Sequence, residues 1–161
     1  MKTHWKKLAG WLAISIIIVV LDQISKLWAV NILKPLGSLQ LIPGIIGFRY
    51  AENTGAAFSA FSESTVLLSL VSAAVCLIVA GVMVRYSGAK AHFMLPLSMV
   101  LAGGVGNLID RLTLGYVVDF FELQFMRFAI FNIADISITI GAALLFIVLL
   151  FGGEKNAGLE N

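Results

Sequence analysis

Charged residues are scarce in this chain of 161 residues: they make up 12% of it, against 60% hydrophobic residues. A soluble domain carries about 25% charged residues, so the composition excludes an ordinary soluble domain and indicates an integral membrane protein. The formal net charge is only +2. The sequence also lacks a long basic run, which argues against nucleic-acid binding.

Cysteine and histidine are nearly absent as well. Cys76 is the only cysteine, so the sequence offers no intramolecular disulfide and no CxxC redox or metal motif. A lone cysteine in an uncharged run is typical of a small buried apolar side chain. His4 and His92 have no second histidine or acid at ligand spacing. We therefore expect no metal site and no cofactor.

Long apolar runs fill most of the chain. At roughly 1.5 Å per residue, about 20 residues cross the hydrocarbon core of a membrane. We predict four transmembrane helices, at residues 8–30, 64–84, 91–110 and 133–153. The first run follows several lysines and resembles a secretory signal peptide. Its apolar character continues past Asp22 and three more spans follow, so we interpret it as an anchor.

The predicted fold class is an all-α polytopic membrane protein, one domain over residues 1–161, with outer loops at 31–63 and 111–132. The loops contain aromatic and β-branched residues, which argues against disorder. Residues 37–42 and 45–50 alternate in polarity around the turn signal Pro43-Gly44. We expect them to form a small extracytoplasmic β-cradle, which residues 116–121 could join.

The orientation of the spans follows from the basic residues near the helix ends, because cytoplasmic loops are enriched in lysine and arginine. One side holds Lys2, Lys6, Lys7, Arg85, Lys90 and Lys155; the other holds Lys34, Arg49, Arg111 and Arg127. The richer side predicts that both termini are cytoplasmic and that the two long loops face outward.

Asp22 and Lys26 stand four residues apart in the first span, the order that favours a same-face helix pair. One interpretation is a structural ion pair near the outer end of the helix, because charges inside a membrane usually pair with one another. The other makes both residues a support that holds the outer loops in place.

Asn53-Thr-Gly55 precedes the second span. Its composition alone would justify a turn. A functional interpretation is equally open: the Asn53 amide offers donors and an acceptor to an extended peptide, while Gly55 and Ala56 allow close approach of a backbone.

The third span ends in a glycine cluster followed by Asn107, Asp110 and Arg111. The cluster lacks the lysine and the preceding strand of a phosphate loop, so we interpret it as close helix packing with Asn107 bonding between helices. Adjacent residues do not face each other on a helix. Arg111 is therefore expected to reach another carboxylate or loop carbonyls rather than Asp110.

Two acids occur in strongly apolar surroundings near the fourth span. Asn132 and Asp135 have the spacing of a helix N-cap and its capping box, so Asp135 has a local structural explanation. Asp119, flanked by valines and phenylalanines, has none, and an unpartnered buried acid is costly.

Two carboxylates that share one water are the catalytic groups of an aspartic peptidase. One of them stays protonated, and the other acts as the general base. We assign the base to Asp135, because a helix N-terminus favours its anion, and the proton to Asp119. A small proton-coupled transporter and a non-catalytic assembly subunit are the alternatives.

Five motifs in order give the chain a close resemblance to bacterial lipoprotein signal peptidase, the signal peptidase II family. They are Asp22-Gln-Ile-Ser-Lys26, Asn53-Thr-Gly-Ala-Ala-Phe58, Gly103-Gly-Val-Gly-Asn107-Leu-Ile-Asp110-Arg111, Val117-Val-Asp119-Phe and Phe131-Asn132-Ile-Ala-Asp135. One departure is small: Ile136 separates Asp135 from Ser137.

The resemblance implies a multi-pass aspartic peptidase of the bacterial cytoplasmic membrane, with its active site near the outer leaflet. It implies a diacylglyceryl-modified prolipoprotein as substrate, cut just before the lipidated cysteine, and Asp119 and Asp135 as the catalytic dyad. Lining and support positions fall on Asn53, Gly55, Asn107, Arg111, Asn132, Asp22, Lys26 and Asp110. Contact with membrane lipids, a monomeric state and inhibition by globomycin-type cyclic peptides are further expectations.

Overall fold

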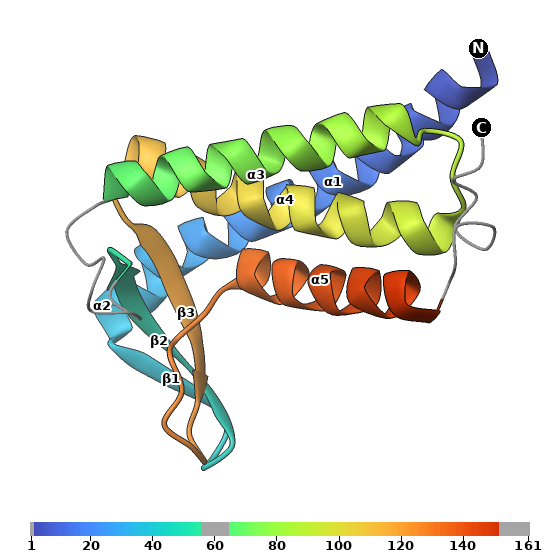
Figure 1. Ribbon diagram of the computed structural model, residues 1–161. Helices are drawn as coiled ribbons and strands as arrows, with labels where there is room; N and C mark the ends of the chain where they lie inside the picture. The colour runs from blue at the N-terminus through green and yellow to red at the C-terminus, as the bar shows by residue number, and fades with distance from the viewer. Residues whose placement is uncertain (1, 56–64, 152–161) are drawn as a thin grey trace.

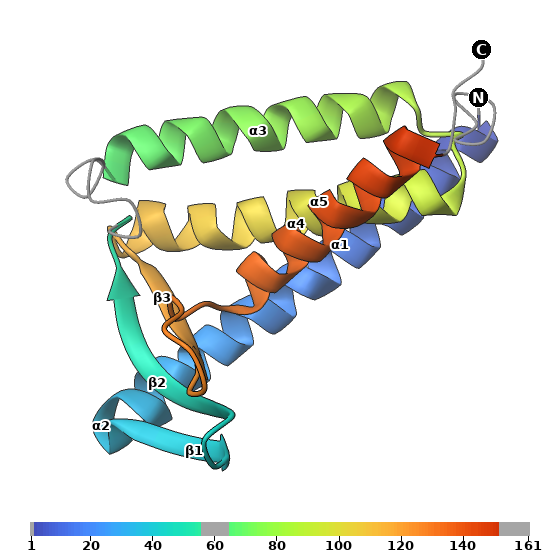
Figure 2. The same ribbon diagram turned by 60° about the horizontal axis from the view of Figure 1, so that its bottom comes forward.

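The computed structural model describes residues 2–55 and 65–151. Its four long helices are α1 (Lys2–Trp28), α3 (Thr65–Arg85), α4 (Ala91–Thr113) and α5 (Ile133–Phe151). All four are long and apolar enough to cross a membrane, which confirms the predicted fold class. The start of α1 and the end of α5 lie at the same end of the bundle, and a small sheet projects from the other end (Figures 1 and 2).

The helices differ from the predicted spans at their ends. The first helix does not stop at residue 30 but continues through a π-helical turn, η1 (Ala29–Leu33), into the short α2 (Lys34–Leu36). Ala29 and Leu33 are completely buried and pack against Val118 and Phe120 of the loop after α4, so this extension of the helix is held by tertiary contacts. α4 reaches Thr113 instead of residue 110. The predicted positions 64, 152 and 153 lie outside the described residues.

The sheet confirms the predicted β-cradle and has three antiparallel strands in the order β1-β2-β3. They are β1 (Ser38–Ile42), β2 (Ile46–Asn53) and β3 (Val117–Leu123). The β1–β2 turn contains Gly44 at φ +73, a conformation that favours glycine. The third strand comes from the loop after α4, as residues 116–121 predicted.

Aromatic and aliphatic side chains join the sheet to the end of the first helix. The ring centroid of Trp28 lies 5.3 Å from that of Phe48 and 6.1 Å from that of Phe120, both in edge-on geometry. Val118 and Phe120 are buried together with Ala29 and Leu33. Such edge-on pairs add to the stabilisation from burial, so β3 is held firmly against the helix bundle.

α4 lies in the middle of the bundle, in contact with α1, α3 and α5. Two of its glycines allow this close packing. A Cβ at Gly103 would overlap the Ala134 carbonyl oxygen of α5, and a Cβ at Gly106 would lie 2.6 Å from a carboxylate oxygen of Asp22 in α1. The predicted role of the glycine cluster in helix packing is therefore correct, and it brings three helices together beside the sheet.

Candidate active site

Asp135 lies in the first turn of α5, where Asn132 caps the helix. The Asp135 backbone N–H donates to Asn132 Oδ1 at 2.9 Å, and the Asn132 backbone N–H donates to Asp135 Oδ2 at 3.2 Å. This reciprocal pair is the predicted capping box. It fixes the carboxylate of Asp135 at the positive end of the helix dipole.

Asp119 lies on β3 and is 1% exposed. Its Oδ2 accepts a hydrogen bond from Asn53 Nδ2 at 2.8 Å, and its Oδ1 accepts one from Asn132 Nδ2 at 2.7 Å. The strand register explains the first contact: Ala51 pairs with Asp119 and Asn53 with Val117. Asn53 is thus a diagonal neighbour on the same face of the sheet.

The Asn53 amide is oriented from its other side as well. Its Oδ1 accepts a hydrogen bond from the Gly55 backbone N–H at 2.8 Å, and Gly55 has φ +97, where glycine is strongly favoured. The turn interpretation of Asn53 is therefore correct, and the turn directs its amide donor at Asp119. The contact of Asn53 with an extended peptide stays a prediction. Ala56 lies outside the described residues.

Asn132 joins the two aspartates, since it donates to Asp119 from its side chain and to Asp135 from its backbone. It is completely buried. Asn107 extends the network: its Nδ2 donates to Asp135 Oδ1 at 2.7 Å, and its Oδ1 accepts from Asn132 Nδ2 at 3.1 Å. The prediction that Asn107 bonds between helices is confirmed.

Lys26 lies beneath this network and is paired with two buried carboxylates rather than one. Its Nζ is 2.8 Å from Asp22 Oδ2 and 2.9 Å from Asp110 Oδ2, and it donates to Asn107 Oδ1 at 3.0 Å. The predicted Asp22–Lys26 pair is present. Its second acid, Asp110, comes from α4.

The two carboxylates bound to Lys26 also hold the backbone next to each aspartate of the site. Asp22 Oδ1 accepts from the Ala134 N–H at 2.9 Å, and Asp110 Oδ2 accepts from the Val118 N–H at 3.0 Å. Ala134 precedes Asp135 and Val118 precedes Asp119 in the chain. One buried ion cluster therefore holds the backbone directly before Asp135 and directly before Asp119.

Arg111 differs in part from its prediction. Its Nη1 lies 3.5 Å from Asn107 O, a carbonyl of its own helix rather than of a loop. Its charge interacts with the carboxylates of Asp135 and Asp119, as predicted, and less strongly with that of its neighbour Asp110. The helix continues three residues further than predicted, which keeps Arg111 in regular helical geometry beside the two aspartates.

Gln23 is a member of the site that sequence reasoning did not identify. Its Nε2 lies 3.0 Å from Asp110 Oδ1, 3.2 Å from Asp22 Oδ2 and 3.2 Å from Gly106 O. Its one sequence signal is an amide beside Asp22 in an apolar run. With this amide in place, the oxygens of both acids have donors.

Burial raises the pKa of Asp119 from 3.8 to about 7, and the charge of Asp135 acts in the same direction. The hydrogen bonds from Asn53 and Asn132 act against the rise, since they stabilise the anion. Near neutral pH the Asp119 carboxyl therefore holds its proton far more readily than an ordinary aspartate does.

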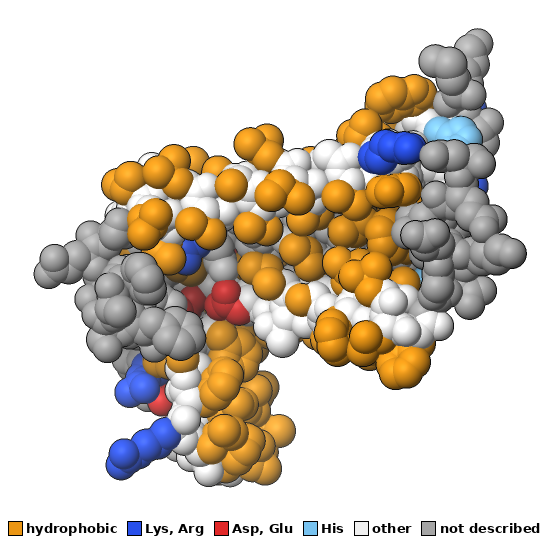
Figure 3. All heavy atoms as spheres, viewed as in Figure 1, with side chains coloured by type: hydrophobic (Ala, Val, Ile, Leu, Met, Phe, Trp, Pro, Cys, Tyr) orange, Lys and Arg blue, Asp and Glu red, His pale blue; other side chains and the backbone are white. Residues whose placement is uncertain are grey.

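Acidic side-chain atoms are visible in Figure 3 at the junction of the bundle and the sheet, among apolar side chains. Asp135 also lines an apolar cavity of about 280 Å³ with Phe128, Phe131 and Ile140. Within residues 2–55 and 65–151 no group of three or more histidine, cysteine or acidic residues could hold a metal ion.

The family model described as "Signal peptidase (SPase) II" matches residues 14–151. The chain is 39% identical to a lipoprotein signal peptidase of Lactobacillus johnsonii, covering 93% of this chain and 97% of that one. It is 41% identical to one of Lactobacillus gasseri, covering 91% and 95%. This chain belongs to the signal peptidase II family.

Solved structures agree with this membership. Two structures described as bacterial membrane enzymes, both obtained by the in meso method, match with TM-scores of 0.80 and 0.81 at 29% and 28% identity. The first match covers 88% of each chain, and the second covers 89% of this chain and 94% of the other. As a member of the signal peptidase II family the chain is a multi-pass bacterial membrane protein and an aspartic protease. The transporter alternative has no support.

Proposed function

We propose that this chain removes the signal peptide from diacylglyceryl-modified prolipoproteins by cutting just before the lipidated cysteine, with Asp119 and Asp135 as the catalytic dyad. One observation carries the dyad: Asn132 donates hydrogen bonds to both carboxylates, to Asp119 Oδ1 at 2.7 Å and to Asp135 Oδ2 at 3.2 Å. Two acids within reach of one residue can act on one water and one peptide bond.

In the proposed reaction Asp135 is the general base. It takes a proton from water as the water oxygen attacks the scissile carbonyl carbon, and the Asp119 O–H donates a hydrogen bond to the carbonyl oxygen. Asp135 then gives the proton to the leaving amine. The environments support this division, because burial raises the pKa of Asp119, whereas Asp135 lies at a helix N-terminus that favours an anion.

The neighbouring amides have positioning roles in this proposal. Asn53, oriented by Gly55, and Asn132 fix the plane of the Asp119 carboxyl group, and Asn107 does the same for Asp135. The Asn53 amide and the Arg111 guanidinium also offer donors for substrate carbonyls. The ion cluster of Asp22, Lys26 and Asp110 supports the dyad from below through backbone amides.

The expected substrate suits a site at one end of the spans. A signal peptide is itself apolar and diffuses laterally in the membrane, and the apolar cavity beside Asp135 is open to such a ligand. The lipoprotein signal peptidases that this chain resembles carry the substrate class in their name.

We extend the proposal to cytoplasmic termini, an active site near the outer leaflet, a monomeric state and inhibition by globomycin-type cyclic peptides.

The test is cleavage of a synthetic diacylglyceryl-modified prolipoprotein peptide by the purified chain in detergent. Product analysis by mass spectrometry should show one cut before the modified cysteine. The same peptide without the diacylglyceryl group is the substrate control. If the diacylglyceryl-modified peptide stayed intact after incubation with the folded chain, the proposed function would be contradicted.

The dyad is tested with Asp119→Asn and Asp135→Asn, which keep side-chain shape and remove the acid. Each should reduce kcat by several orders of magnitude. Glu122→Gln is the matched control, because Glu122 also lies on β3 but pairs with Arg49 at 2.8 Å away from the dyad. Near-normal turnover in either aspartate variant would remove that residue from the dyad.

A further inference from the structure

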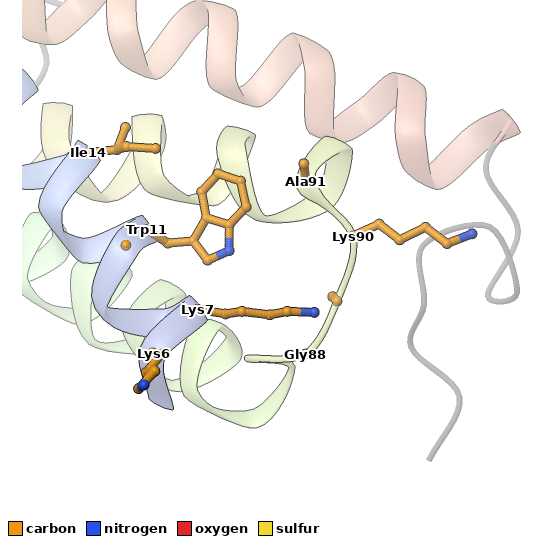
Figure 4. A pocket seen from close by; sticks show the side chains of 9 residues that line it. Lys6, Lys7, Trp11, Ile14, Gly88, Lys90 and Ala91 are labelled. Carbon is orange, nitrogen blue, oxygen red and sulfur yellow. The ribbon is translucent and has the colours of Figure 1, made fainter. Parts of the chain in front are cut away.

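A second cavity lies at the end of the bundle opposite the aspartates. It has a volume of about 490 Å³ and lies between the start of α1 and the loop that leads into α4. Its polar lining comes from Lys6, Lys7 and Lys90, with Trp11 as the large apolar residue. Figure 4 shows Lys7 reaching from α1 towards the loop of Gly88.

At this end of the bundle, the helices described within residues 2–55 and 65–151 carry no acidic residue near the three lysines. Residues 1–21 and 65–109 contain no aspartate or glutamate. Among the ion pairs identified within residues 2–55 and 65–151, none joins Lys6, Lys7 or Lys90 to an acid. A cavity of this kind has a positive potential that attracts an anion.

The surface of α1 that continues from the cavity towards the aspartates is apolar. Continuing from Lys7 and Trp11 along the same face of α1, Ile14, Ile17 and Leu21 follow at helical spacing. Ile17 and Leu21 are 58% and 54% exposed. This face therefore presents charge, then an aromatic ring, then aliphatic side chains. That is also the order of phosphate, glycerol and acyl chains in a phospholipid.

Trp11 lies between the lysines of the cavity and the apolar face of α1. Tryptophan favours the membrane–water interface, where its ring is apolar and its N–H is polar. Trp11 is half-buried, and its indole nitrogen is drawn on the side of the ring nearer Lys7 and Gly88 (Figure 4). The indole can thus contact acyl carbons while its N–H points towards the charged part of the cavity.

We propose that this cavity binds the phosphate group of an anionic glycerophospholipid, whose acyl chains lie along Ile14, Ile17 and Leu21 of α1. Free phosphate shares the anionic chemistry but has no part that would use the apolar face, which is why we assign the lipid. Basic pockets between membrane helices favour anionic headgroups. The site is separate from the aspartates, because the 27-residue helix α1 is about 40 Å long.

Gly10 allows the cavity to be filled without a change in charge. It lines the cavity, and a Cβ added to it would meet no atom within 4 Å. Leucine is also a better helix former than glycine, so Gly10→Leu should fold. Gly81→Leu is the matched control: Gly81 lies in α3, has the same open surroundings and does not line the cavity.

Lipid binding can be measured on the full chain by native mass spectrometry in detergent, with phosphatidylglycerol, phosphatidylcholine and inorganic phosphate as probes. The wild-type chain should bind phosphatidylglycerol in preference to phosphatidylcholine. The combined variant Lys6→Gln, Lys7→Gln, Lys90→Gln should lose about fivefold in affinity per lysine, or about a hundredfold in total. Gly10→Leu should lose the tight site, whereas Gly81→Leu should retain it.

A charge-matched variant at the other end, Lys34→Gln with Arg49→Gln and Arg127→Gln, should keep the tight site. Cleavage of the prolipoprotein peptide confirms that the lysine variant is folded. Equal affinity of the wild-type chain and both cavity variants for phosphatidylglycerol would overturn the proposal. Displacement of phosphatidylglycerol by millimolar inorganic phosphate would overturn the assignment to a lipid.

Discussion

The raised pKa of Asp119 predicts a specific dependence of stability on pH. A carboxyl group whose pKa is higher in the folded than in the unfolded state binds its proton more tightly when folded. The stability that it contributes is present at low pH and is lost as the pH rises from 3.8 to about 7. Above this window the folded chain has to hold a buried anion.

The size of the effect follows from the two pKa values. The interval between 3.8 and about 7 corresponds to about 4 kcal/mol in total, of which about 3 kcal/mol falls between pH 5 and pH 8.5. Asp119 is 1% exposed, so solvent screening reduces this little. Asp119→Asn removes the ionisation. It also brings an NH2 group opposite the Asn53 or Asn132 donor, at a cost of about 1 to 3 kcal/mol that does not change with pH.

The measurement is the free energy of unfolding by sodium dodecyl sulfate at pH 5 and pH 8.5. Tryptophan fluorescence is a suitable signal, because Trp28 packs against Phe120, next to Asp119 on β3. From pH 5 to pH 8.5 the wild-type chain should lose about 3 kcal/mol more than Asp119→Asn. Glu122→Gln should follow the wild-type chain. Parallel pH dependences of the wild-type chain and Asp119→Asn would refute the argument.

Three further variants test the support of the dyad. Lys26→Met leaves two buried carboxylates unpaired, and should lower the free energy of unfolding by about 3 to 5 kcal/mol and reduce kcat, measured by peptide cleavage. Asn53→Ala removes a hydrogen bond that lowers the pKa of Asp119, so the alkaline limb of the kcat/KM profile should move to higher pH; an unchanged limb would assign it to another group. Gly103→Ala places a Cβ against the first turn of α5 and should reduce kcat, whereas Gly81→Ala, with open space around it, should not.

The parts of the structure that the sequence predicted are those that depend on local spacing. The uncharged runs predicted the spans, because hydrocarbon excludes unpaired charge whatever the tertiary structure is. Asn132 and Asp135 stand three residues apart, and Asp22 and Lys26 four. These separations alone bring the side chains together at a helix N-terminus and on one helix face.

The contacts that the sequence did not predict join distant segments. Asn53 reaches Asp119 across 66 positions, and Lys26 reaches Asp110 on another helix. The first contact depends on the register shift of β2 between Phe48 and Ala51. A shift of one residue would turn Asn53 to the opposite face of the sheet, and no local pattern specifies where such a shift occurs.

The charges of the site together explain why one aspartate of the pair should be neutral. Lys26 carries one positive charge against its two paired carboxylates, and Arg111 supplies a second positive charge near the dyad. With Asp135 ionised, three carboxylates face two cations. Ionising Asp119 as well would add a fourth carboxylate at a buried position, next to Asp135 and without a further cation. The ion cluster thus does more than position the backbone, because its charge balance favours a single negative charge on the proposed dyad. In the proposed reaction Asp135, at a helix N-terminus, carries that charge.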